Sequence, residues 1–133
     1  MTSLQMPKVD KSILTSKDKI ALDLKKILKS ENILSHEDEV RPYETDALAA
    51  YKQKPLLVVL PETVEQVSEI LKYCNENKIK VVPRGAGTGL SGGALPLADC
   101  VLLGMGKFNK ILEIDYQNKC VVLQPCVTNL AIT

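Results

Sequence analysis

The sequence predicts an α+β fold: an N-terminal helix, a small α/β subdomain with parallel strands, and the start of an antiparallel subdomain. Three patterns predict this class. A periodic apolar stripe between 16 and 30 indicates the helix. Apolar runs at 56–60 and 79–82 flank a helical pattern at 64–74, and such a strand–helix–strand unit places parallel strands side by side. Two apolar runs between 111 and 124, separated by a short polar pair, indicate an antiparallel hairpin.

The chain divides into three segments. Residues 1–14 carry no sustained apolar pattern, and we expect a disordered lead-in. Residues 15–54 form an N-terminal helical segment, with a second helical turn expected near 46–50 inside a loop. Residues 55–133 contain the strands. The apolar side chains of the first helix recur at the spacing of one helix face: Ile20, Leu24, Ile27 and Leu28.

The third segment begins with a continuous apolar run at 56–60, which is typical of a strand covered on both faces. Thr63 and Gln66 have the capping-box spacing and predict a helix start. A further strand is expected at 100–103. Near the end of the chain, Thr128 or Asn129 is a suitable helix N-cap. The apolar residues after it stop within one turn, so we expect this helix to be cut off.

Composition narrows the class of protein. The 133 residues are 45% hydrophobic, and 17 lysines and arginines nearly balance 16 aspartates and glutamates, which suits one globular domain. Five aromatic residues and no basic stripe argue against nucleic-acid binding. No apolar run has the length of a signal peptide or a membrane span. The four cysteines are scattered without a CxxC pair, so we expect reduced thiols, no metal site and a cytoplasmic protein.

A glycine-rich stretch, PRGAGTGLSGG, follows the strand at 79–82 and contains five of the seven glycines. A P-loop would require Gly-Lys-Ser/Thr at its end, which this stretch lacks. The sequence GTGLSG matches the dinucleotide fingerprint, but that motif requires a helix directly afterwards. Pro96 would interrupt a helix in the residues that follow. The candidate binding residues of the stretch are Pro83, Arg84, Gly85, Ala86, Gly87, Thr88, Gly89, Leu90, Ser91, Gly92 and Gly93.

Two further interpretations of this stretch stay open. Successive glycines can turn several amides to one side and form a cradle for a diphosphate without a Cβ in the way. In such a cradle Arg84 would add charge at the mouth, and Thr88 and Ser91 would add hydroxyl donors. Alternatively, the glycines only allow the connection to pack tightly against a sheet. The amide cradle accounts best for the glycine density and the hydroxyl side chains.

The stretch PRGAGTGLSGGALP resembles the pyrophosphate loop of FAD-linked oxidases of the vanillyl-alcohol oxidase and p-cresol methylhydroxylase (PCMH) type. Within that family it is similar to the FAD subunits of glycolate oxidases and to D-lactate dehydrogenases. The segments RPYETDALAAYKQKPLLVVLPETVEQVSEILKYC, FNKILEID and QPCVTNLAI resemble further stretches of the same subunit, in order. The likeness runs from about residue 15 to the last residue.

The resemblance implies a PCMH-type FAD-binding domain that is incomplete in this chain. Backbone amides of 85–93 would hold the FAD diphosphate, and a turn near the flavin, usually Pro-Gly-Val-Thr, corresponds to Pro125, Cys126, Val127 and Thr128. A Cβ at position 126 would cost about 1–3 kcal/mol if the position required a positive φ. Because no histidine lies in the loop, noncovalent FAD is expected.

The function implied is the FAD-binding portion of an oxidoreductase of 2-hydroxy acids such as glycolate or D-lactate, in which the flavin accepts a hydride from C2 of the substrate. No catalytic residue is assigned, and His36, the only histidine, is expected on the surface. The substrate domain is expected beyond Thr133, so the chain alone is expected to be inactive, with the remaining part of the oxidase as a candidate partner chain. The alternatives are a truncated or split-gene remnant and a non-enzymatic diphosphate-binding module.

Overall fold

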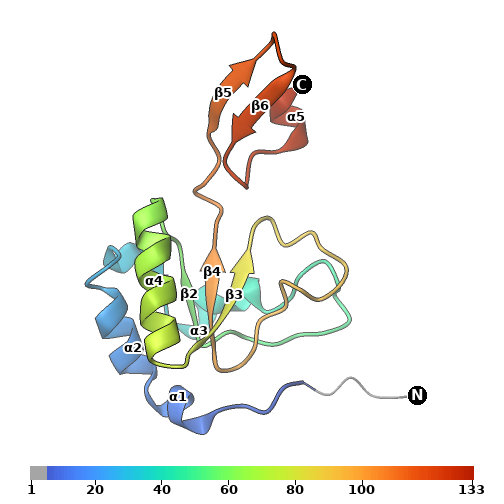
Figure 1. Ribbon diagram of the computed structural model, residues 1–133. Helices are drawn as coiled ribbons and strands as arrows, with labels where there is room; N and C mark the ends of the chain where they lie inside the picture. The colour runs from blue at the N-terminus through green and yellow to red at the C-terminus, as the bar shows by residue number, and fades with distance from the viewer. Residues whose placement is uncertain (1–5) are drawn as a thin grey trace.

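The computed structural model describes residues 6–133 and contains two sheets joined by one linker (Figure 1). The larger sheet has four strands in the order β1-β2-β4-β3, and the smaller is the β5-β6 hairpin. The strands are β1 (Ile33–Leu34), β2 (Leu57–Val59), β3 (Lys80–Arg84), β4 (Cys100–Gly104), β5 (Ile111–Asp115) and β6 (Cys120–Leu123). The helices are α1 (Lys11–Thr15), α2 (Lys17–Leu24), α3 (Glu37–Val40), α4 (Val64–Glu76) and α5 (Asn129–Ile132), with 3-10 turns η1 (Ser30–Asn32) and η2 (Arg41–Tyr43). This mixed architecture confirms the predicted α+β class.

Strands β2, β4 and β3 are parallel, as the strand–helix–strand pattern predicts, but β2 and β3 are not neighbours. Strand β4 lies between them, with Leu102 paired to Val58 on one side and Val82 on the other. All five residues of β4 are buried, so it takes the central position. Strand β3 carries Pro83, which has no amide hydrogen to donate and therefore suits an edge strand.

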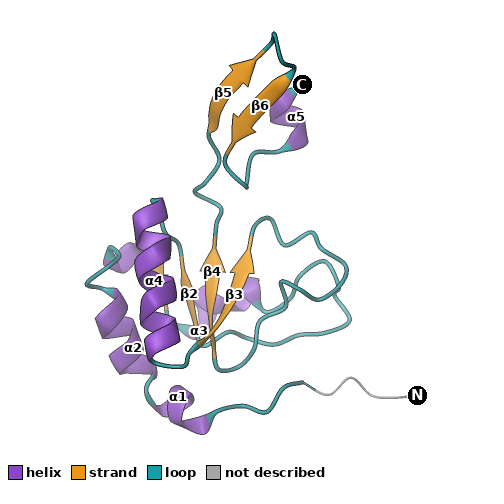
Figure 2. Ribbon diagram, in the orientation of Figure 1, coloured by secondary structure: helices purple, strands orange, loops and turns teal. Residues whose placement is uncertain are grey.

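The core lies on both faces of the larger sheet. Helices α2 and α4 cover one face (Figure 2), where their apolar side chains pack with alternate residues of β2 and β4. Val58 and Leu102 point to the opposite face, where Val40 of α3 contacts them. Both faces of β2 and β4 are therefore buried, which explains the uninterrupted apolar runs in their sequences. The fully buried core includes Leu24, Leu57, Val59, Ile70 and Val101.

Helix α4 begins where the capping pattern predicts. The Thr63 hydroxyl accepts a hydrogen bond from the amide of Gln66 at 3.3 Å. The side-chain oxygen of Gln66 accepts from the amide of Glu62 at 2.7 Å rather than from that of Thr63. Two amides at the start of the helix are thereby satisfied, although the reciprocal bond is shifted by one residue from the expected capping box.

The N-terminal part differs from the expectation in three places. Residues 1–5 of the expected lead-in lie outside the described residues, and helix α1 already begins at Lys11 because the Asp10 carboxylate accepts from the amide of Ser12 at 2.9 Å. The helix that carries the apolar stripe ends as α2 at Leu24, earlier than expected, and turns follow it. The helical turn expected near 46–50 is absent from its place, and helical structure lies instead at 37–43.

The hairpin at 111–124 is antiparallel, as predicted, and projects away from the larger sheet (Figure 1). Its connection is longer than the expected two-residue turn, because four residues at 116–119 form it and Lys119 has φ 53°. The Asp115 carboxylate accepts from the amide and the side chain of Asn118 at 2.9 and 2.7 Å, which stabilises this turn. Among residues 6–133, no helix has the length and apolar character needed to span a membrane.

Candidate functional site

The glycine-rich stretch forms the connection from β3 to β4 and leaves the sheet at the carboxyl end of β3 (Figure 2). In open α/β sheets, ligands bind outside this edge. Turns and irregular backbone occupy residues 85–99, so no helix follows the GTGLSG sequence. A dinucleotide fingerprint, which places its pyrophosphate on a helix N-terminus, does not describe this loop. A phosphate ligand here would have to be held by the loop itself.

The backbone amides at 86–93 have no hydrogen-bond partner in the part of the chain that the structure describes. Among residues 6–133, no amide between 86 and 93 donates a hydrogen bond, whereas the carbonyl oxygens of Gly87 and Gly92 accept bonds from Ala47 at 2.8 Å and Leu95 at 3.1 Å. The carbonyls therefore hold the loop to the protein, while the amides stay available. An anion-binding loop requires backbone amides that are free to donate to a ligand, and the amides at 86–93 meet this requirement.

The five glycines differ in the structural requirement they meet. Gly87 and Gly92 have φ values of +71° and +75°, which side chains rarely adopt. A Cβ at Gly89 or Gly93 would have no atom within 4 Å, so neither glycine is required for packing. A Cβ at Gly85 would lie 3.6 Å from the Cys126 sulfur, at ordinary contact distance. Tight packing against the sheet therefore does not explain the glycine density of the outer loop.

Arg84 points away from the expected mouth of the loop. Its guanidinium group donates to the carbonyl oxygen of Ala94 from Nε at 3.2 Å and from Nη2 at 2.5 Å, and lies 6.0 Å from the centre of the Tyr43 ring. The side chain is 7% exposed. Burial lowers the pKa of Arg84, and the nearby Asp46 charge partly opposes this shift. Instead of adding charge at the surface, as the sequence suggested, Arg84 joins the two ends of the loop.

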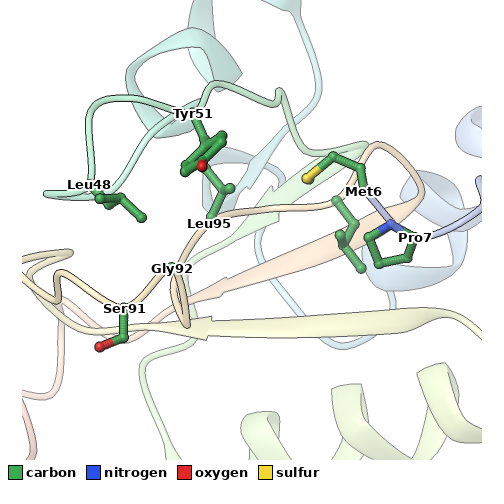
Figure 3. Close-up of a pocket in the computed structure, with 8 residues that line it drawn as sticks. Met6, Pro7, Leu48, Tyr51, Ser91, Gly92 and Leu95 are labelled. Atoms are coloured by element: carbon green, nitrogen blue, oxygen red, sulfur yellow. The ribbon is translucent and has the colours of Figure 1, made fainter. Parts of the chain in front are cut away.

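The segment at 44–51 supports the loop from one side. The Asp46 carboxylate is buried: one oxygen accepts from the amide of Leu48 at 2.9 Å, and the other has no hydrogen-bond partner among residues 6–133. A cavity of about 280 Å³ lies between this segment and the loop (Figure 3). Its lining is mostly apolar: Met6, Pro7, Leu48, Tyr51, Ser91, Gly92, Leu95 and Leu97. Reasoning from residue patterns missed this supporting segment, although it lies within the stretch RPYETDALAAY that carries part of the resemblance.

The second predicted binding segment lies near the start of the loop at Cys126. The amide of Cys126 donates to the carbonyl oxygen of Phe108 at 2.9 Å, and its sulfur lies near Gly85. Cys126 does not have a positive φ. The backbone strain that a positive φ would cause at this position is therefore absent. Thr128 instead caps α5, where its hydroxyl accepts from the amide of Ala131 at 3.3 Å. The structure thus brings Cys126 to the base of the loop, while Thr88 and Ser91 remain exposed on its outer part.

The other reactive side chains considered in the sequence are two buried cysteines and one exposed histidine. Burial raises the pKa of Cys74 and of Cys100 to about 11, so both are inert core thiols. His36 is exposed at the start of α3. Within residues 6–133, no cluster of three histidine, cysteine or carboxylate side chains is arranged to hold a metal ion.

A mainly parallel sheet whose carboxyl edge carries a glycine loop with open amides, followed by an antiparallel hairpin, is an arrangement that suits a nucleotide-binding domain. Residues 55–132 match the family model described as "FAD binding domain", which covers more than half of the chain. The chain therefore belongs to the family of FAD-binding domains. This membership confirms the resemblance that the glycine loop and the flanking segments predict.

Individual relatives agree with this assignment. The chain is 45% identical to the glycolate oxidase subunit GlcD of Escherichia coli (strain K12), over 96% of this chain and 24% of the relative. It is 38% identical to a mitochondrial D-2-hydroxyglutarate dehydrogenase of Arabidopsis thaliana, over 68% of this chain and 16% of the relative. The chain thus spans about a quarter, or less, of the length of these relatives.

Solved structures share the fold. A p-cresol methylhydroxylase structure matches with a TM-score of 0.76 and 29% identity, over 93% of this chain and 24% of that chain. A 4-ethylphenol oxidase from Gulosibacter chungangensis matches with a TM-score of 0.79 and 23% identity, over 97% of this chain and 25% of that chain. The predicted fold class is thereby confirmed.

Proposed function

We propose that residues 83–93 and 125–128 hold FAD noncovalently, as part of an oxidoreductase of 2-hydroxy acids such as glycolate or D-lactate. The observation that carries this proposal is the run of amides between 86 and 93 that donate no hydrogen bond among residues 6–133. Their open surroundings fit a diphosphate, because a Cβ at Gly89 or Gly93 would meet no protein atom within 4 Å. When bound, FAD supplies a hydride acceptor for C2 of the substrate.

The roles proposed for the residues are binding and orientation. Open amides of the loop would donate to the phosphate oxygens, and the exposed hydroxyls of Thr88 and Ser91 would add donors at the rim. Arg84 would hold the two ends of the loop together through its hydrogen bonds to the carbonyl oxygen of Ala94. The turn at 125–128 would line the flavin side of the site. A noncovalent site is supported by the loop itself, which contains no histidine.

We further propose that these 133 residues alone do not oxidise a hydroxy acid, and that the remaining part of the oxidase completes the site. The glycine loop contains no histidine, and His36 is exposed at the start of α3. The chain covers about a quarter of the related glycolate oxidase subunit. A cytoplasmic location is part of the proposal, and the four free thiols support it.

A titration with FAD, followed by flavin fluorescence, tests the binding proposal. We expect weak, saturable binding that inorganic pyrophosphate competes away. Gly89→Val should abolish it by filling the space at the amides, whereas Gly106→Val, at another open glycine outside the loop, should leave it unchanged. Equal affinity in wild type and Gly89→Val would contradict the cradle, and so would a wild type that does not bind FAD.

Turnover is tested separately. The chain is supplied with FAD, glycolate or D-lactate, and an artificial electron acceptor. We expect no reduction of the acceptor above the level with FAD alone. Substrate-dependent reduction would show that the chain is catalytically complete and would overturn the second proposal.

A further inference from the structure

The linker between the larger sheet and the hairpin, residues 105–110, contains one lysine whose side chain bonds back to the larger part of the molecule. Lys107 donates from Nζ to the Asn32 side-chain oxygen at 2.7 Å and to a Glu62 carboxylate oxygen at 2.7 Å. These partners belong to η1 and to the segment between β2 and α4. One side chain of the linker therefore reaches two separate elements of the larger part of the molecule.

The partners of Lys107 are themselves fixed. Asn32 is 2% exposed, its side-chain amide donates to Glu62 at 3.2 Å, and its carbonyl oxygen accepts from the amide of Leu60 at 2.9 Å. The hydrogen bond from Lys107, followed by that from Asn32, lowers the pKa of Glu62 to about 2, so the carboxylate is ionised near neutral pH. Asn32 therefore offers Lys107 a buried acceptor, and Glu62 adds a charged acceptor that is partly exposed.

Phe108, the residue after Lys107, connects the linker to the turn at 125–128 in the proposed flavin site. Phe108 is 3% exposed, and its carbonyl oxygen accepts from the amide of Cys126 at 2.9 Å. The Cys126 sulfur in turn lies beside Gly85. Adjacent linker residues therefore attach to the larger sheet on one side and to the turn at 125–128 on the other.

We propose that Lys107 is a positioning residue that holds the turn at 125–128 against the base of the glycine loop. Its bonds to Asn32 and Glu62 fix the linker, and the fixed linker presents Cys126 to Gly85. The importance of this placement for FAD rests on the proposed function, but the placement itself can be measured without a ligand.

The accessibility of the Cys126 thiol reports this placement. In a Cys120→Ser background, which removes the exposed thiol, Cys126 is the one cysteine that is not buried. We expect Lys107→Met to raise the rate of Cys126 alkylation by iodoacetamide on the order of tenfold, because the turn opens more often. Lys107→Arg, which keeps the charge and the donors, should restore a rate close to that of the parent.

Lys110→Met is the matched control, since Lys110 ends the same linker and its side chain makes no hydrogen bond or ion pair among residues 6–133. Its alkylation rate should equal that of the parent. A loss of packing throughout the protein is recognised by alkylation of Cys74 and Cys100, which should stay protected in every variant. If Lys107→Met exposes these thiols as well, the alkylation rate of Cys126 is measured in Glu62→Gln instead. This variant weakens the bond from Lys107 to residue 62 and keeps the bond from Lys107 to Asn32.

An unchanged alkylation rate in Lys107→Met, or an equal increase in Lys110→Met, would overturn the proposal. An FAD titration of the same variants then tests the functional consequence. We expect Lys107→Met to weaken FAD binding and Lys110→Met to leave it unchanged. If wild type binds no FAD, the proposed function fails, while the alkylation rates still decide whether Lys107 positions the turn.

Discussion

The guanidinium group of Arg84 donates two hydrogen bonds to the carbonyl oxygen of Ala94, so the two residues that flank the glycines at 85–93 are joined directly. The amide of Met105 donates to the carbonyl oxygen of Arg84 at 2.8 Å, which ties the same residue to the end of β4. Arg84 therefore fixes the distance between the two ends of the loop. A diphosphate bound on the outer side would meet amides whose positions this bridge constrains.

Replacing Arg84 tests this bridge. Arg84→Met removes both bonds to Ala94 and keeps an apolar stem against Tyr43, so the free energy of unfolding should fall by about 2 kcal/mol, as for other buried charge-assisted hydrogen bonds. Urea denaturation measures the loss. Arg41→Met is the control, because Arg41 is exposed and its variant should unfold within about 0.5 kcal/mol of wild type. Equal stability of the two variants would show that the bridge does not hold the loop.

Replacement by alanine should destabilise the protein at Gly87 but not at Gly89. Gly87→Ala places a Cβ at φ +71° and should destabilise the protein by about 1–2 kcal/mol. Gly89→Ala adds a Cβ in open space without a positive φ, so the free energy of unfolding should change by less than about 0.5 kcal/mol. Thermal denaturation of both variants checks this. A large loss of stability in Gly89→Ala would indicate a packing role for the outer loop.

The sequence predicts the larger sheet well because its strands are marked by local patterns. The uninterrupted apolar runs of β2 and β4 reflect burial on both faces, and Thr63 marks the start of α4. Residue patterns do not determine that β4 lies between β2 and β3, since the order of strands depends on which face and edge each strand buries. The helical turn expected near 46–50 is absent because the Asp46 carboxylate accepts from the amide of Leu48 and stabilises a turn instead.

The candidate site is predictable in part for a similar reason. A dense run of glycines indicates a loop with accessible amides, and the structure contains one. The direction of Arg84 is not encoded locally: it depends on the Ala94 carbonyl, ten residues later, and on Tyr43, which belongs to another segment. The contact between Gly85 and Cys126 depends on the linker, so no pattern within either segment predicts it.

The contacts of Glu62 predict how stability depends on pH. Hydrogen bonds from Lys107 and Asn32 lower its pKa from 4.5 to about 2 in the folded protein. A lowered pKa stabilises the fold at a pH above 4.5, and this contribution is lost as the pH falls from 4.5 through 2. In urea denaturation from pH 7 to pH 2, wild type should therefore lose more stability than Glu62→Gln. Parallel curves for the two proteins would contradict the assigned ion pair.

The four cysteines should separate into three classes of reactivity. Cys120 is exposed and should react first with a disulfide reagent at pH 8, whereas Cys126 is half-buried and should react more slowly. Burial raises the pKa of Cys74 and Cys100 to about 11, so little thiolate forms at pH 8, and both should react only after unfolding. Mass spectrometry of timed samples identifies each modified residue. Early modification of Cys74 or Cys100 would contradict the described core.

The hairpin should bind a hydrophobic dye through its exposed apolar side chains. Leu112 and Ile114 of β5 are 61% and 50% exposed, and the pairing of β5 with β6 is irregular between Ile111 and Glu113. Exposed apolar patches of this kind bind anilinonaphthalene sulfonate (ANS). The double variant Leu112→Thr, Ile114→Thr keeps residues that favour strands and should lower ANS fluorescence, whereas Glu113→Thr should not. Unchanged fluorescence in the double variant, with the hairpin intact by circular dichroism, would show that these two side chains are not accessible in solution.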